Sequence, residues 1–277
     1  MSTLAELERM AAAKPTTVPA LVGQRVLIAD IERVQGEAVI RKKFWDMGDV
    51  KYLQRIKPDD VISWPRTVCM AAKWYGDDKV TFTAEWQKGG YVRFMQRCWK
   101  LFDQAQIVVG HNMERFDKKK LNAGWAELGF PPPSPYKVVD TLKVAWSEFS
   151  FESNTMDALC KRLGITAKDG HYDIATADAA VAGDVEAQAR LESYNIGDIH
   201  ATEALYDYLR PWMRNHPHNV NGNADDKPVC NRCWQPEMAA NGYTLAVVIS
   251  YNLYRCSVCG GNIKTSTHHR AANTRGV

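Results

Sequence analysis

Short apolar runs and longer amphipathic stretches alternate along most of the chain. The runs that predict strands are residues 25–32, 38–44, 67–74, 80–86, 107–110 and 137–140. Apolar residues at helical spacing predict helices over residues 91–105, 116–128, 156–163 and about 184–209. Strands in succession, followed by helices that alternate with strands, favour a mixed sheet with helices packed on it.

The last predicted helix contains a charged residue on its apolar face. The predicted inward stripe is Leu191, Tyr194, Asp198, Ala201, Leu205 and Tyr208. A carboxylate within an apolar stripe needs a partner or a bound cation, because an isolated buried charge is costly. Asp198 is therefore a candidate ligand.

Two further acids end the first strand. Side chains alternate between the faces of a strand, so Asp30 and Glu32 point the same way. Two crowded carboxylates repel each other unless a cation lies between them, and hard divalent ions prefer oxygen ligands. Alone, this triplet is more often a solvated strand end.

Two more residues become informative beside these acids. Asp117 opens the helix after the strand that ends at Gly110, although a Phe-Asp pair is by itself more often a helix cap and packing anchor. Tyr194 lies one helical turn before Asp198 and shares its face.

In this order, the residues resemble the three motifs of the DnaQ-like (DEDD superfamily) 3′→5′ exonucleases. Asp30-Ile31-Glu32 is similar to the first motif, Asn112 through Phe116-Asp117 to the second, and Tyr194 through Asp198 to the tyrosine form of the third. The resemblance covers about residues 22–212. It implies an α/β protein with an RNase H-like mixed β-sheet flanked by helices. Arg33 departs from it, because many members have Thr there, and this bears on contacts to the terminal nucleotide.

The resemblance also implies an activity and a set of roles. Asp30, Glu32, Asp117 and Asp198 would hold two Mg²⁺ or Mn²⁺ ions, and Tyr194 would orient the attacking water. The implied substrate-binding residues are Asn112, Ile31 and Phe116. The implied reaction releases 5′-mononucleotides from the 3′ end of single-stranded nucleic acid, with DNA favoured. An exoribonuclease with the same site and a non-catalytic nucleic-acid-binding or recruitment module are the alternatives.

The C-terminal part contains two Cys-x-x-Cys pairs, Cys230 with Cys233 and Cys256 with Cys259. Four thiolates complete a closed tetrahedral site for one structural Zn²⁺, and β-forming residues 243–254 predict the strands of a zinc ribbon. Two disulfides are the alternative. Basic and aromatic residues nearby are candidates for gripping a phosphate backbone, while a replication or repair protein is the other candidate partner. These residues are Arg232, Trp234, Arg255, Lys264 and Arg270.

Composition shifts divide the chain. The predicted parts are an N-terminal extension (1–21), the nuclease domain (22–213), a polar linker (214–228), the ribbon (229–262) and a basic tail (263–277). The net charge of +3 is too small to indicate nucleic acid binding by itself. Neither a membrane span nor a signal peptide is predicted, so a cytoplasmic location is expected.

Overall fold

The computed structural model describes residues 25–38, 58–165, 173–217, 228–246 and 249–272. The predicted N-terminal extension lies outside these ranges, as do most of the predicted strand 38–44 and residues 218–227 of the predicted linker.

A five-stranded mixed sheet forms the centre of the larger domain. Its strands are β1 (Val26–Val34), β4 (Arg66–Trp74), β5 (Val80–Ala84), β6 (Ile107–Gly110) and β7 (Lys137–Asp140), in the order β5-β4-β1-β6-β7. β4 is antiparallel to β1 and β5, whereas β6 is parallel to β1 and β7. The short strands β2 (Glu37–Ala38) and β3 (Val61–Ser63) pair with each other, and a 3-10 turn, Pro58–Asp60, precedes β3.

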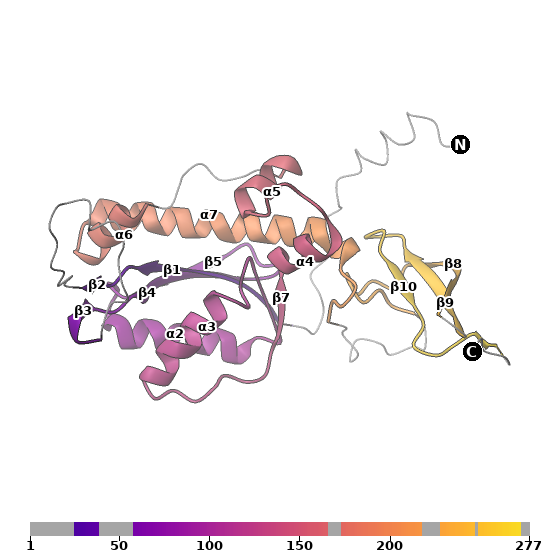
Figure 1. Cartoon of the computed structure of the whole chain (residues 1–277), viewed down its shortest axis with the longest axis horizontal. Helices are drawn as coiled ribbons and strands as arrows, with labels where there is room; N and C mark the ends of the chain where they lie inside the picture. The colour runs from indigo at the N-terminus through magenta and orange to yellow at the C-terminus, as the bar shows by residue number, and fades with distance from the viewer. Residues whose placement is uncertain (1–24, 39–57, 166–172, 218–227, 247–248, 273–277) are drawn as a thin grey trace, which may run out of the picture.

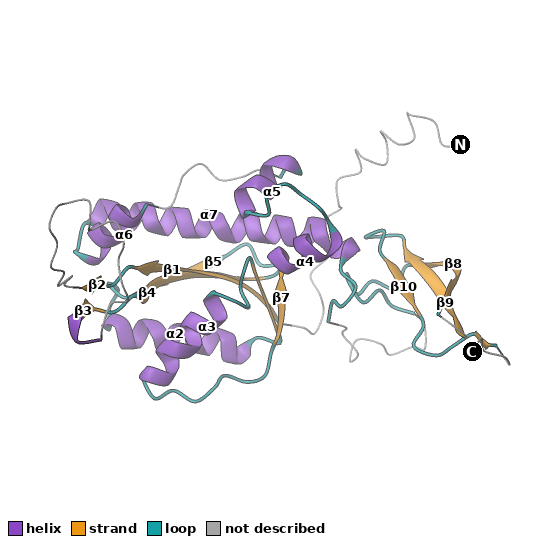
Figure 2. Cartoon of the chain, in the orientation of Figure 1, coloured by secondary structure: helices purple, strands orange, loops and turns teal. Residues whose placement is uncertain are grey.

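Helices cover both faces of this sheet (Figures 1 and 2). α2 (Gly90–Gln104) and α3 (Asp117–Glu127) lie on one face. The long helix α7 (Val185–Leu209) crosses the other face, accompanied by α4 (Thr141–Glu148), α5 (Met156–Arg162) and α6 (Ile174–Val181). The expected mixed sheet flanked by helices is confirmed.

The alternation of side chains along β1 separates two cores. Val26 and Ile28 pack with Leu205 and Tyr206 of α7, while Leu27, Ala29 and Ile31 pack with side chains of α2 and α3. Even-numbered residues of this strand therefore face α7, which places Asp30 on the α7 side.

The predicted helices and longer strands agree closely with these bounds, with a few differences. α4 and α6 were not predicted. On α7, Tyr206 and not Tyr208 is fully buried. This helix contacts α4, α5 and α6 as well as the sheet, so more than one stripe of its surface is covered.

A second antiparallel sheet forms the C-terminal module beyond the end of α7 (Figure 1). Its central strand β9 (Ile249–Cys256) pairs with β8 (Met238–Leu245), β10 (Asn262–Lys264) and β11 (Arg270–Ala271). Strands are therefore present between the two Cys-x-x-Cys pairs, as predicted.

Two buried arginines join this module to α7. A 3-10 turn, Arg210–Trp212, ends the helix, and the Arg210 side chain is only 1% exposed. Its Nε and Nη2 donate to the backbone oxygen of Arg232, at 3.1 and 2.6 Å, while Nη1 donates to the Tyr75 hydroxyl at 2.8 Å. In return, Arg232 Nε donates to the Met213 oxygen at 2.6 Å.

Aromatic packing extends this interface. Trp234 packs in the same core as Tyr206 and Met213, and its Nε1 donates to the Pro217 oxygen at 3.1 Å. Arg232 and Trp234 are thus buried between the two parts of the chain, and the expectation that they grip a phosphate backbone is wrong. Arg255, Lys264 and Arg270 are exposed.

Arg210→Ala should lower the free energy of unfolding by on the order of 3 kcal/mol, because the Arg232 oxygen and the Tyr75 hydroxyl lose a buried charged donor. Urea denaturation followed by tryptophan fluorescence measures this change. Arg214→Ala is the matched control, since Arg214 pairs with Glu148 but is 77% exposed, and its loss should cost less than about 1 kcal/mol. Equal losses in the two variants would contradict a structural role for the buried arginine.

Candidate active site

Three carboxylates meet between β1 and α7. Asp30 and Glu32 point from β1 towards α7, where they meet Asp198. One carboxylate oxygen from each of these three residues lies within 4.8 Å of the other two. Asp30 and Glu32 are half-buried and Asp198 is buried. This donor set consists only of carboxylate oxygens, which suits Mg²⁺ or Mn²⁺ and not a soft metal ion.

Asp117 approaches from the opposite side of the sheet. It is 3% exposed, and its Oδ1 accepts a hydrogen bond from the backbone N–H of Ile31 at 3.3 Å. The pairing of β1 with β6 ends at Ile28, so beyond it the backbone N–H of Ile31 is available to a side chain, here that of Asp117. Asp117 therefore lies beside the residue between Asp30 and Glu32, although it is not one of the three acids grouped above. Burial raises the pKa of its carboxyl to about 7.

The loop before Asp117 is held by a carboxylate that the sequence did not single out as functional. Asp140 ends β7, and its side chain accepts backbone N–H groups of Asn112, Glu114 and Leu142 at 2.9, 3.1 and 3.1 Å. These bonds fix the turn in which Asn112 takes a left-handed conformation, with φ of 64°. Asp140 thereby helps to fix the start of α3 and so the position of its first residue, Asp117.

Tyr194, on α7, lies close to the three acids. Burial raises the pKa of its phenol above the ordinary value, and the negative charges of Asp198, Glu32 and Asp30 raise it further. The phenol is consequently protonated at neutral pH and is available as a hydrogen-bond donor.

An open hollow of about 570 Å³ adjoins the acids. Ile31, Glu32 and Phe116 line it, together with Arg33 to Gly36, Pro65 and Ile174. Of the three predicted substrate-binding residues, Ile31 and Phe116 therefore line one hollow beside Glu32. Asn112 is not among the lining residues, and its backbone N–H is bound to Asp140.

Asn195 is a second residue that the sequence did not single out. It is fully buried on α7, and its Nδ2 donates to Asp30 Oδ2 at 2.7 Å. Its position three residues before Asp198, hence on the same helix face, is the only sequence signal that could have indicated it.

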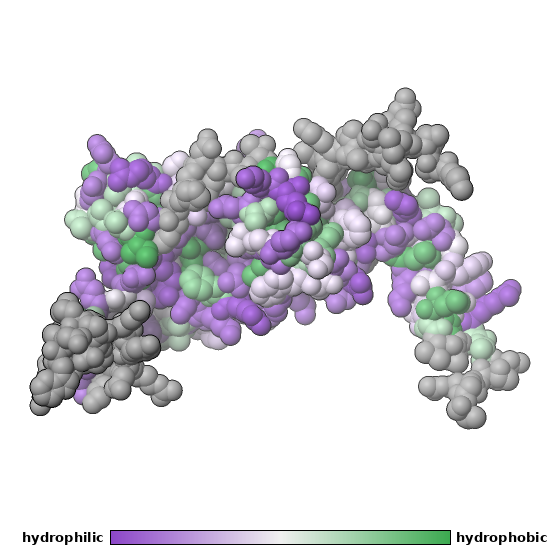
Figure 3. All heavy atoms as spheres, turned by 45° about the horizontal axis from the view of Figure 1, so that its top comes forward, coloured by the Kyte–Doolittle hydropathy of each residue, from purple (hydrophilic) through white to green (hydrophobic). Residues whose placement is uncertain are grey.

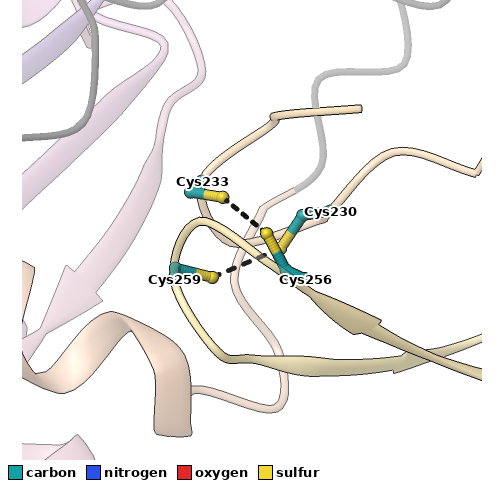
Figure 4. Close-up of side chains that lie close together, drawn as sticks. All are labelled: Cys230, Cys233, Cys256 and Cys259. Atoms are coloured by element: carbon teal, nitrogen blue, oxygen red, sulfur yellow. Dashed lines mark hydrogen bonds between the residues drawn. The ribbon is translucent and has the colours of Figure 1, made fainter. Parts of the chain in front are cut away.

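The four cysteines of the C-terminal module point towards one another (Figure 4). The sulfur atoms of Cys230 and Cys259 are 3.6 Å apart and those of Cys233 and Cys256 are 3.4 Å apart, far longer than the roughly 2.05 Å of a disulfide. Tetrahedral zinc with Zn–S bonds of about 2.3 Å separates its sulfurs by roughly 3.8 Å. The cluster therefore fits one zinc ion.

Comparison with known proteins assigns the larger domain. The family model described as the RNase_H superfamily matches residues 65–210, more than half of the chain. This chain belongs to the RNase_H superfamily. The matched region includes Asp117, Tyr194 and Asp198 and begins after Asp30 and Glu32, and membership of this superfamily supports a nuclease.

A solved structure similar to this chain is the family B DNA polymerase from the hyperthermophilic archaeon Pyrobaculum calidifontis. Sequence identity is 17%, the TM-score is 0.45, and the similarity covers 68% of this chain and 25% of the polymerase. The chain thus spans about a quarter of that polymerase's length. No curated protein matches the chain.

The outer surface is largely hydrophilic in the view of Figure 3, with small apolar patches between charged and polar side chains. Within the described ranges, every helix is too short or too polar to cross a membrane.

Asp140→Ala should reduce nuclease activity by roughly 10- to 100-fold, because the loop from Asn112 to Phe116 loses its anchor and Asp117 shifts. Rates on a short oligonucleotide, measured alongside thermal unfolding, test this. Asp103→Ala is the control: Asp103 also anchors a loop, through the N–H and hydroxyl of Ser134, near the start of β7 and away from the acids. Similar activity losses in both variants would show that loop anchoring in general, and not the position of Asp117, limits the rate.

Proposed function

We propose that this protein is a metal-dependent 3′→5′ exonuclease of the DnaQ-like type that acts on single-stranded nucleic acid, with DNA favoured. The observation that carries the proposal is the meeting of Asp30, Glu32 and Asp198 within 4.8 Å, at the junction of a sheet and a helix far apart in sequence. Asp117 and Tyr194 adjoin this cluster, as the motif resemblance requires.

The four acids are proposed to hold two Mg²⁺ or Mn²⁺ ions. When bound, such ions supply a nucleophilic hydroxide and stabilise negative charge on the phosphoryl and leaving oxygens. The repulsion among the acids, which burial increases, favours taking up cations. Burial raises the pKa of Asp117, and a cation beside this carboxyl would favour its charged form.

Tyr194 is proposed to orient the attacking water. A phenol surrounded by carboxylates keeps its proton, so it donates a hydrogen bond and does not compete for the cation as another carboxylate would.

The hollow beside Glu32 supports an enzyme that acts at a chain end. Apolar walls from Ile31 and Phe116 adjoin the acids, and a volume of about 570 Å³ is in the range that holds a small ligand. A terminal base stacked on Phe116 would place its phosphodiester near the carboxylates.

Digestion of matched single-stranded DNA and RNA oligonucleotides, labelled at either end, tests the direction and the substrate. With Mg²⁺ or Mn²⁺ we expect a 3′ label to be released at once as a mononucleotide and a 5′ label to give a ladder, and EDTA should stop both. Asp198→Asn should reduce the rate at least about 100-fold, whereas Asp178→Asn, the same change at an exposed position on α6, should not.

Each contrary result has a distinct meaning. Immediate release of the 5′ label rejects the direction, and faster digestion of RNA rejects DNA as the favoured substrate. A normal rate in Asp198→Asn rejects the assigned site.

We further propose that Cys230, Cys233, Cys256 and Cys259 bind one structural zinc ion in a ribbon that spans residues 229–262. With four protein ligands the ion has no open position, so its role is to hold the fold. The exposed Arg255, Lys264 and Arg270 are the candidates in this module for contact with nucleic acid.

Elemental analysis of protein purified without chelator should find one zinc per chain, and Cys256→Ser should lose it. Because Arg232 lies between Cys230 and Cys233 and its oxygen binds Arg210, zinc loss should also lower the thermal stability of the larger domain. A zinc-free protein of unchanged stability would contradict the assignment.

A further inference from the structure

We infer that Asn195 is a positioning residue that holds the Asp30 carboxylate in the orientation needed to bind a metal ion; this inference rests on the proposed function. The motif resemblance gives no role to this position. The contact between Asn195 and Asp30 joins residues 165 positions apart.

The amide grips Asp30 at two atoms. Nδ2 donates to Oδ2 at 2.7 Å and makes a longer contact, 3.4 Å, with the backbone oxygen of the same residue. Both atoms of Asp30 only accept hydrogen bonds, so the NH₂ end of the amide must face them. Because one nitrogen contacts both the side chain and the backbone of Asp30, it restricts rotation of the carboxylate relative to β1.

Restriction matters here because of the neighbouring charges. Glu32 and Asp198 have carboxylate oxygens within 4.8 Å of that of Asp30, and like charges this close repel. Without the Nδ2 donor of Asn195, this repulsion would favour turning Asp30 away from the cluster. Asn195 opposes this and occupies only part of the acceptor capacity of the carboxylate, which has about four lone-pair directions.

The neutrality of the amide is also important. Lysine or arginine at this position would neutralise Asp30 and compete with a metal ion, whereas another acid would add to the repulsion. An amide is neutral and supplies donors, as do the groups that orient metal ligands in other proteins.

The burial of Asn195 gives weight to its contact with Asp30. Its side chain is fully buried, yet among the described residues no donor reaches its Oδ1. A buried amide is costly unless it is hydrogen-bonded. Here the satisfied end is the one that faces Asp30.

Mn²⁺ binding without nucleic acid, measured by calorimetry and by electron paramagnetic resonance, tests the inference directly. Asn195→Ala and Asn195→Leu should each raise the Kd for Mn²⁺ by roughly 10- to 100-fold. Leucine restores the volume but not the donor, so it should not rescue binding. Thr202→Ala is the control: Thr202 is equally buried on α7 but contacts Met156, and its loss should change the Kd less than about twofold.

Activity supplies a second measurement. In both Asn195 variants the Mn²⁺ concentration that gives half-maximal rate should rise, with the KM for the oligonucleotide unchanged and part of the rate recovered at high Mn²⁺. A Kd for Mn²⁺ within twofold of the wild-type value in either folded variant, or rescue by leucine, overturns the inference. If alanine prevents folding, the leucine variant decides.

These results separate the inference from the proposed function. A wild-type protein that digests oligonucleotides while Asn195→Leu binds Mn²⁺ normally rejects the inference alone. A wild-type protein that digests nothing, with Mn²⁺ binding that depends on both Asp30 and Asn195, rejects the proposed function and supports the positioning role.

Discussion

The position of α7 on the sheet is the constraint on which the rest of the structure depends. Polar contacts fix it along more than half of the helix: Asn195 with Asp30, Glu203 with Lys73, and Asp207 with Tyr75. Apolar contacts alone would tolerate a small slide of a helix on a sheet, but hydrogen-bonded pairs have strict distance limits. A shift by one turn, about 5.4 Å, would break all of these pairs and withdraw Asp198 from β1.

The same helix links the acid cluster to the C-terminal module. Asp198 lies near its middle, and Arg210 follows its end and binds the loop between Cys230 and Cys233. The bonds at this end are buried and charge-assisted, so they resist exchange with water. The module is therefore held by side-chain contacts as well as by the covalent chain, and its exposed basic residues keep a defined position relative to α7.

The sequence predicted the features that depend on local periodicity. Alternation along β1 was sufficient to place Asp30 and Glu32 on one face, and helical spacing placed Tyr194 and Asp198 together. It could not predict Asp140 or Arg210, whose partners become neighbours only after folding: Asn112 is 28 positions from Asp140, and Arg232 is 22 from Arg210. Arg232 shows the converse limit, because a basic residue beside a Cys-x-x-Cys pair is expected to be exposed and only tertiary packing reveals its burial.

The acid cluster and the arginine interface illustrate opposite uses of buried charge. Arg210 is almost fully satisfied by acceptors, including the Arg232 oxygen and the Tyr75 hydroxyl, so its charge stabilises the folded chain. Asp30, Glu32 and Asp198 instead bring carboxylate oxygens within 4.8 Å of one another, and repulsion between like charges at this distance opposes folding. Both arrangements depend on α7, which means that the stable contacts at Arg210 and Asp207 help to hold the unfavourable one at Asp198. The repulsion within the acid cluster is therefore opposed by contacts elsewhere on the same helix.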